Sequence, residues 1–413
     1  MISSVHESPA TRRRPRRQTP VNLKFDIPFF LAIFTLLVFG AIMVYSASWD
    51  LSFYYYDDPS LMFRRQMLWL ALGLVLAAAA SMTDYHYYRK VIVPGMLVTL
   101  GALLLVLLRS EVRYGAARTL NSGSFMPSEA AKLVTIIYLS IWLYSKRNQL
   151  NDISFGLVPL GVILGAVSGF ILAQPDLSAA ATIFFLGGLL FFLAGGELKQ
   201  IFVLLVLAVF VGWVVVQIHP TGNKRITNFL QAVDDPTQAD YHVKRSFGAF
   251  LNGGMFGTGI GKSTAKLTGL PVPPTDSIFA VIGEETGVAG TSIMIGLYLL
   301  LLWRGMHIAK NAPDMLGSLM AAGLTLWITL EAIINMAVMV GMLPFAGNAL
   351  PFISVGGSSL IVSLIAVGII LNISRNSNQP NLNPQRTSNA LDGMRRGYRG
   401  RSISRPGGAP GSR

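Results

Sequence analysis

The sequence contains no cysteine and little charge. Without cysteine in 413 residues, the chain has no disulfides, no thiolate metal sites and no cysteine nucleophile. Only 13% of the residues are charged, 52% are hydrophobic, and the mean hydropathy is +0.53. A soluble protein of this length needs much more polar surface. The composition therefore indicates an integral membrane protein.

Common catalytic signatures are also missing. The five histidines are scattered and form no HExxH motif, which argues against a zinc hydrolase. No GxSxG motif occurs. The Lys-Ser pair at Lys262 follows glycines, but a phosphate-binding loop of the type GxxxxGK[ST] requires glycine at position 256, where this chain has Phe256. A nucleotide-binding function is therefore excluded at this motif.

The net charge of +13 lies mostly at the two ends of the chain. Residues 1–26 and 374–413 together carry eleven of the thirteen net charges. Both segments are rich in Arg, Pro, Gly, Ser and Asn, so we expect disordered basic tails. Positive charge beside a membrane attracts anionic lipid and needs no nucleic acid partner. We therefore expect no nucleic acid binding.

Residues 27–373 form the predicted membrane domain. A membrane-spanning helix needs about 20 mostly apolar residues, and the chain offers ten such segments. The predicted fold is thus an all-α polytopic membrane protein of about ten transmembrane helices, with a long extracytoplasmic loop, 219–276, between helices 7 and 8. The spans are 27–48, 66–83, 91–108, 128–145, 155–174, 179–194, 201–218, 277–303, 316–342 and 355–373.

Basic residues predict the orientation of these spans. The tails and the short loops on their side of the membrane contain 21 Lys and Arg, whereas the short loops on the opposite side contain five: Arg64, Arg65, Arg109, Arg113 and Arg118. Positively charged loops stay in the cytoplasm. Both termini are therefore predicted to be cytoplasmic.

Ionisable residues inside the predicted spans are candidate functional residues, because they are costly in hydrocarbon. Glu129 and Lys132 stand at i and i+3, so they can pair on one helix face. That pair either holds the helices together or lines a polar cavity that contacts a substrate headgroup. The adjacent acids at 284 and 285 are candidates for a cation site or a proton relay. The remaining ones are Asp176, with helix capping its expected role, and Glu331.

The loop 219–276 is basic and rich in glycine. Backbone N–H groups of 253–261, with Lys262 and Lys266 nearby, are candidates to bind a phosphate or pyrophosphate. The alternative is a flexible linker in which the glycines only permit turns.

Asp276 lies where the chain re-enters the membrane after PVPPT. The prolines stiffen this approach and hold the carboxylate at the interface. A partly desolvated carboxylate is a stronger base than one in water, which suits a general base. The alternative is that Asp276 only caps the following helix.

Several of these segments carry motifs of one family. They are MVYSAS (43–48), PSEAAKL (127–133), QPDLS (174–178), GGMFGTGIGKS (253–263), TDSIFAVIGEETG (275–287) and GMLPFAGNALPFISVGGSS (341–359). With them the chain resembles the SEDS family (shape, elongation, division and sporulation) of FtsW/RodA-type bacterial peptidoglycan polymerases. The resemblance covers nearly all of 27–373. MVYSAS and the long basic N-terminal tail favour the FtsW branch.

The resemblance implies a glycosyltransferase of the bacterial cytoplasmic membrane. It implies that lipid II is polymerised into glycan strands at the outer face during division or elongation. Asp276 falls on the family's catalytic aspartate and would deprotonate the acceptor sugar. We expect substrate-binding residues at Glu129, Lys132, Arg225, Lys262, Ser263, Ser354, Gly356 and Gly357.

The resemblance also implies partners and a cofactor. The partners are a class B penicillin-binding protein and other divisome or elongasome membrane proteins, and a divalent cation, Mg²⁺ or Mn²⁺, would stabilise the leaving pyrophosphate. Two other functions stay open. One is a lipid II flippase that uses the intramembrane charges, and the other is a non-catalytic scaffold of the same complexes.

Overall fold

The structure is a computed structural model that describes residues 25–108, 126–218 and 220–377. The basic tails lie almost wholly outside these ranges, as do Arg109, Arg113 and Arg118. Within them the chain forms twelve α-helices, two 3₁₀ turns, one π turn and no strand. The expected all-α fold is therefore confirmed.

Each of the ten predicted spans corresponds to a helix. Eight are long and apolar enough to cross a membrane. This count joins α5 to the π turn Ile153–Leu157 directly before it, and the exceptions are α6, which is shorter than that joined span, and α4, which carries Glu129 and Lys132. The ten helices are α1 (Ile27–Tyr56), α2 (Leu61–Met82), α3 (Tyr88–Leu108), α4 (Pro127–Lys146), α5 (Val158–Leu172), α6 (Leu177–Leu193), α7 (Leu198–Ile218), α10 (Ile278–Lys310), α11 (Met315–Met339) and α12 (Gly357–Ser377).

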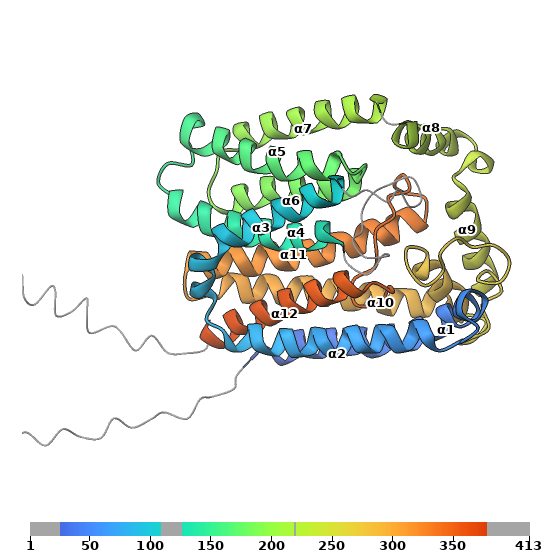
Figure 1. Cartoon of the computed structure of the whole chain (residues 1–413). Helices are drawn as coiled ribbons and strands as arrows, with labels where there is room; N and C mark the ends of the chain where they lie inside the picture. Colours follow the sequence, from blue (N-terminus) through green and yellow to red (C-terminus); the bar gives the residue numbers. More distant parts are fainter. Residues whose placement is uncertain (1–24, 109–125, 219, 378–413) are drawn as a thin grey trace, which may run out of the picture.

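The long loop between α7 and α10 is itself helical. It contains α8 (Pro220–Asp234) and α9 (Tyr241–Gly253), both with polar and apolar faces. The predicted loop therefore contains two helices before its glycine-rich stretch begins. In Figure 1 they cover one end of the bundle, while the start of α1 and the end of α12 lie at the other end.

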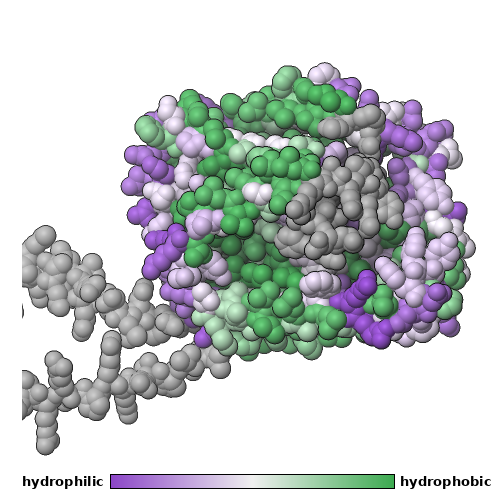
Figure 2. Space-filling model, in the orientation of Figure 1, coloured by the Kyte–Doolittle hydropathy of each residue, from purple (hydrophilic) through white to green (hydrophobic). Residues whose placement is uncertain are grey.

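The bundle has an apolar middle and polar ends. Figure 2 shows a hydrophobic band across the helices, with hydrophilic residues gathered at both ends. Many apolar side chains on this band are exposed, including Leu68, Leu97 and Phe202. Lipid tails cover such side chains as favourably as a protein core does. The exposed band is thus what a multi-pass membrane protein requires.

Polar contacts join the two chain ends at one end of the bundle. The Asp26 backbone N–H donates to Ser374 Oγ at 3.0 Å. Arg304, near the end of α10, donates to the Asp26 carboxylate through Nη2 at 2.5 Å. The start of α1 and the ends of α10 and α12 therefore share one face. This agrees with both termini lying on one side of the membrane.

Helix α10 is broken at Gly287, where φ is +67° and ψ is −168°. The predicted span 277–303 is thus two helical pieces, and the first is fully buried. The segment after α9 fills the break. Thr258 and Gly259 donate their N–H groups to the carbonyls of residues 284 and 285, and residues 288 and 289 donate back to the carbonyls of 254 and 255. The break leaves none of these groups unpaired.

Glycine is required where this segment meets α10. A Cβ at Gly257 would lie 2.2 Å from the Glu285 carbonyl oxygen, and one at Gly287 would lie 2.5 Å from the Gly257 nitrogen. Both residues also have positive φ, which costs other L-residues about 1–2 kcal/mol. The glycine-rich motif therefore allows two backbones to touch.

We predict that Gly257→Ala destabilises the protein by roughly 2–5 kcal/mol, the sum of left-handed strain and overpacking. Gly248→Ala is the control, since Gly248 lies in α9 with no atom within 4 Å of the added Cβ. It should be neutral or slightly stabilising. Thermal melting in detergent measures the stability of both variants. Equal melting temperatures would contradict the close contact between the backbones at Gly257 and Glu285.

Candidate active site

Hydrogen bonds to three consecutive carbonyls hold the backbone in place directly before α10. The Pro274 carbonyl accepts from Val355 N–H at 2.8 Å, and the Thr275 carbonyl accepts from Ser354 Oγ at 2.6 Å. The Asp276 carbonyl accepts from Asn335 Nδ2 at 2.9 Å. The partners come from α11 and from the connection 340–356. Asp276 is thus fixed where three distant segments meet.

The cap of α10 is the residue after Asp276. Ser277 is the N-cap residue, and its side chain makes no capping hydrogen bond. The N-cap position thus falls one residue after Asp276, whose side chain is half-buried. Asp276 lies at the end of the bundle away from the start of α1 and the end of α12, which agrees with the predicted interface site.

Arg225 and a histidine reach the same place from the outer helices. The Arg225 guanidinium carbon lies 5.1 Å from the centre of the Phe345 ring. The His242 ring stacks on Phe345 with centroids 4.0 Å apart. His242 Nδ1 lies 3.4 Å from Ser277 Oγ. A cation from α8 and the histidine that reaches Ser277 therefore share one aromatic ring.

The predicted phosphate site in the glycine-rich segment is largely occupied by the protein. N–H groups of Gly257, Thr258 and Gly259 donate to backbone carbonyls. Lys266 Nζ pairs with Glu285 at 3.2 Å and also donates to the Ser46 and Gly261 carbonyls. These groups hold the segment in place, which does not favour an anion cradle here.

Glu284 and Glu285 anchor that segment. Glu284 accepts from the side chains of Ser263 and Thr264 and from the N–H of Ala265. Glu285 accepts from Ser46 Oγ at 2.6 Å, which ties α1 to the same place. Both acids are almost fully buried. Their oxygens are taken by these donors, so the contacts are structural rather than those of a cation site.

The predicted substrate-binding residues thus fall into groups. Lys262 is exposed beside the glycine-rich segment, whereas Ser263 is buried in the anchor. Ser354 holds the Thr275 carbonyl, and the Gly356 N–H donates to the Gln66 side chain at 3.3 Å. A Cβ added at Gly357 would lie 2.8 Å from Trp69 Nε1, so Gly357 packs against the Trp69 side chain. Of the set, Ser354 contacts the segment 274–276 directly, and Arg225 approaches it through the Phe345 ring.

The predicted Glu129–Lys132 pair is present and has a third member. Lys132 Nζ donates to Glu129 Oε1 at 2.8 Å and to Glu331 Oε1. The ammonium also lies 5.7 Å from the Trp327 ring. Lys132 and Glu331 are about 95% buried. The cluster ties α4 to α11 deep in the bundle.

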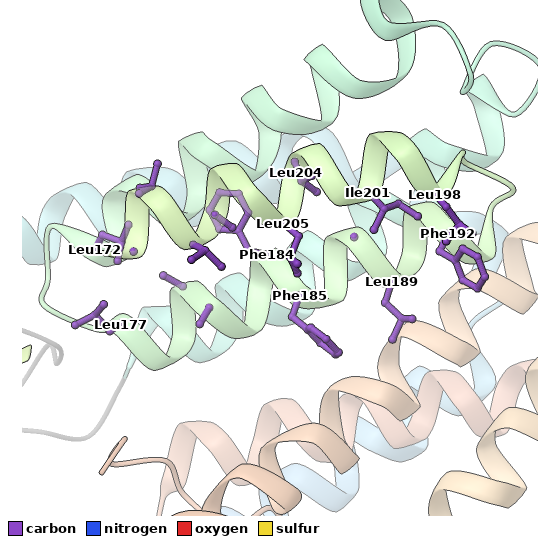
Figure 3. A pocket seen from close by; sticks show the side chains of 17 residues that line it. Leu172, Leu177, Phe184, Phe185, Leu189, Phe192, Leu198, Ile201, Leu204 and Leu205 are labelled. Atoms are coloured by element: carbon purple, nitrogen blue, oxygen red, sulfur yellow. The ribbon is translucent and has the colours of Figure 1, made fainter. Parts of the chain in front are cut away.

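A groove of about 520 Å³ lies between α6 and α7. Its seventeen lining residues include no charged side chain, and Figure 3 shows side chains of both helices facing the space. The groove reaches Leu172 and Leu177 at the end nearer α8. A Cβ at Gly222, in α8, would lie 3.2 Å from Leu177 Cδ1. Arg225 follows one turn later.

The sequence interpretation missed four residues of this site. Asn335 and Gln66 are polar residues inside apolar helices, which is a detectable signal because burial of an amide needs partners. His242 and Phe345 carried no such signal. Their contact joins positions about a hundred residues apart, and only the folded chain reveals it.

Three comparisons with known proteins agree on the family that this chain resembles. The family described as cell cycle protein, FTSW_RODA_SPOVE, matches residues 28–379. The probable peptidoglycan glycosyltransferase FtsW of Trichlorobacter lovleyi is 38% identical over 360 residues, covering 85% of this chain and 93% of the relative. Stage V sporulation protein E of Bacillus subtilis is 37% identical over 358 residues, covering 85% and 97%.

Solved structures have the same fold. One, titled "Structural coordination of polymerization and crosslinking by a peptidoglycan synthase complex", aligns with a TM-score of 0.70 at 25% identity, over 87% of this chain and all of that one. The rod shape determining protein RodA of Thermus thermophilus aligns with a TM-score of 0.65 at 24% identity, with the same coverage, and shows the fold alone.

We predict that Lys132→Ala destabilises the protein by about 3–5 kcal/mol, because it leaves two buried carboxylates without their cation. Adding Glu129→Gln and Glu331→Gln should recover much of that loss. Lys146→Ala, at the exposed end of α4, is the control and should stay within about 0.5 kcal/mol of the parent. Melting temperatures of Lys132→Ala, of the triple variant and of Lys146→Ala measure these changes in stability. An unchanged melting temperature of Lys132→Ala would contradict the stabilising role of the ion cluster.

Proposed function

Because the chain belongs to the cell cycle protein family of FtsW, RodA and SpoVE and is an FtsW-like peptidoglycan glycosyltransferase of the membrane, we propose that Asp276 is its general base. The observation that carries this proposal is the fixation of the carbonyls of 274, 275 and 276. It holds a half-buried carboxylate in one place at the end of the bundle. A base needs such fixed placement, because catalysis depends on geometry before acidity.

In the proposed reaction, lipid II is both donor and acceptor. Asp276 takes the proton of the acceptor sugar's 4-hydroxyl, and that oxygen attacks the anomeric carbon of the donor. The bond to the polyprenyl pyrophosphate breaks, and the pyrophosphate leaves with the electron pair. Arg225 stands beside this segment and offers a positive charge to the developing anion.

The groove between α6 and α7 supports a lipid-linked substrate. Its lining is apolar throughout, so a polyprenyl chain is the ligand that suits it. Leu177 at its end contacts the start of α8, where Arg225 follows within a turn. A substrate lying along this line has its chain in the groove, its pyrophosphate at Arg225 and its sugars at Asp276.

Two further elements of the proposal concern placement and partner. We place the face that carries both chain ends in the cytoplasm, on the basis of the Lys and Arg distribution. The site then faces outward, where peptidoglycan is built. The similar solved structure belongs to a complex that coordinates polymerisation and crosslinking. This supports a class B penicillin-binding protein as the partner.

The divalent cation stays a prediction. Among residues 25–108, 126–218 and 220–377, no group of three or more His, Cys, Asp or Glu is placed to hold a metal ion. Protein side chains of this part therefore do not form a metal site by themselves, and no step above depends on one. Polymerisation with and without EDTA would test the cation requirement.

We predict that Asp276→Asn lowers polymerisation of labelled lipid II at least roughly 100-fold, the lower end of a general base's contribution. The assay uses the full chain with its penicillin-binding partner and reads glycan ladders. Asp235→Asn makes the same chemical change at an exposed site in the outer loop and should keep parental activity. Melting and partner binding should be unchanged in both variants.

Continued polymerisation by Asp276→Asn would exclude Asp276 as the base. Absence of product from the parent protein, even with the partner and a divalent cation, would instead favour the flippase or the scaffold.

We also predict that Gly188→Phe raises the KM for lipid II roughly tenfold, equivalent to about 1.4 kcal/mol of binding, because the ring fills the groove. The effect should shrink for a lipid II analogue with a short chain. Gly165→Phe, on α5 and outside the groove, is the matched control, since nothing lies within 4 Å of the added Cβ. An unchanged KM in Gly188→Phe would remove the groove from the substrate path.

A further inference from the structure

His242 lies at a junction of three parts of the outer face. Its ring stacks on Phe345, with an angle of 24° between the rings. Its Nδ1 reaches Ser277 Oγ, the side chain next to Asp276. Its backbone N–H donates to Asp240, the N-cap of α9. One side chain thus connects α9, the start of α10 and the connection 340–356.

The same ring contact reaches α8. Arg225 lies against Phe345 as well, while α8 otherwise packs chiefly on α7 and the turn Pro236–Gln238. Phe345 is therefore a point where residues of α8 and α9 both contact the connection 340–356. Anything that moves the His242 ring changes how Arg225 and the Asp276 segment face each other.

We propose that neutral His242 is a positioning residue for the glycosyl transfer, holding the Arg225 side of the site against the Asp276 segment through Phe345 and Ser277. This inference rests on the proposed function, since it assigns His242 to the site built around Asp276. His242 itself is not placed in contact with the reacting atoms. Its effect is on how well the base and the cation are aligned.

Charge around His242 explains why the neutral ring is the working form. Burial lowers the pKa of His242, the Asp240 carboxylate opposes this, and the Arg225 guanidinium adds to it. Asp276 stands beside Ser277, the connection 340–356 contains no titratable side chain, and Glu331 on α11 is paired with Lys132. The nearest acids on α10, at 284 and 285, are engaged by residues 263–266. Protonation would set an imidazolium against Arg225 at the same ring.

The test is the pH profile of lipid II polymerisation by the full chain with its partner. Since the pKa of His242 is lowered, activity should be complete above that pKa and should fall as pH drops through it. His242→Gln should show a lower kcat at neutral pH and keep only the acid limb that protonation of the general base Asp276 produces. His307→Gln makes the same change at the opposite end of α10 and should keep the parental limb.

A second measurement separates positioning from general stability. His242→Ala and Phe345→Leu should each lower kcat about tenfold with little change in KM, the equivalent of about 1.4 kcal/mol. The double variant should lose no more than either single one, because both break the same contact. Additive losses, or a fall in melting temperature that accounts for the lost rate, would overturn the inference.

The outcomes distinguish this inference from the proposed function. If Asp276→Asn polymerises lipid II, the proposed function fails and this inference fails with it. If Asp276→Asn is inactive and His242→Gln keeps the parental acid limb, only the role of His242 is wrong. If Asp276→Asn is inactive and the acid limb changes in His242→Gln but not in His307→Gln, both stand.

Discussion

The break in α10 at Gly287 is the constraint on which the outer half of the molecule depends. A buried helix that stops and restarts leaves backbone donors and acceptors unpaired, which is costly away from water. This chain pairs them with the glycine-rich segment after α9, through four backbone hydrogen bonds. Glycine is needed on both sides, because the backbones approach more closely than any Cβ allows. The first piece of α10 is thereby separated from the rest, and Asp276 stands at its start.

Buried charge then fixes the surrounding elements. Glu284 and Glu285 collect donors from 263–266 and from Ser46 of α1, so the glycine-rich segment is locked from a second direction. Deeper in the bundle, Lys132 joins α4 to α11 through Glu331. Glu331 and Asn335 stand at i and i+4 on α11, so they share a face. One helix therefore carries both the intramembrane ion cluster and the amide that holds the Asp276 carbonyl.

The arrangement suits chemistry on a substrate that is part lipid and part sugar. The apolar groove, Arg225 and Asp276 follow one another from the membrane toward the outer loop. Each is supplied by a different part of the chain, so the site exists only when α6 to α9 are packed against α10 to α12.

The sequence by itself determined the ten helices, the amphipathic nature of the outer segment and the Glu129–Lys132 pair, because hydropathy, periodicity and i, i+3 spacing are local properties. It also marked Asp276, through the prolines before it and the family motif. Tertiary structure alone decided the rest. Four features join residues that are distant in sequence. They are the break at Gly287, the partners of the acids at 284 and 285, the addition of Glu331 to the ion pair, and the contacts of Arg225 and His242 with Phe345. Such contacts depend on how helices pack and on which buried polar groups find each other, and no local pattern specifies either.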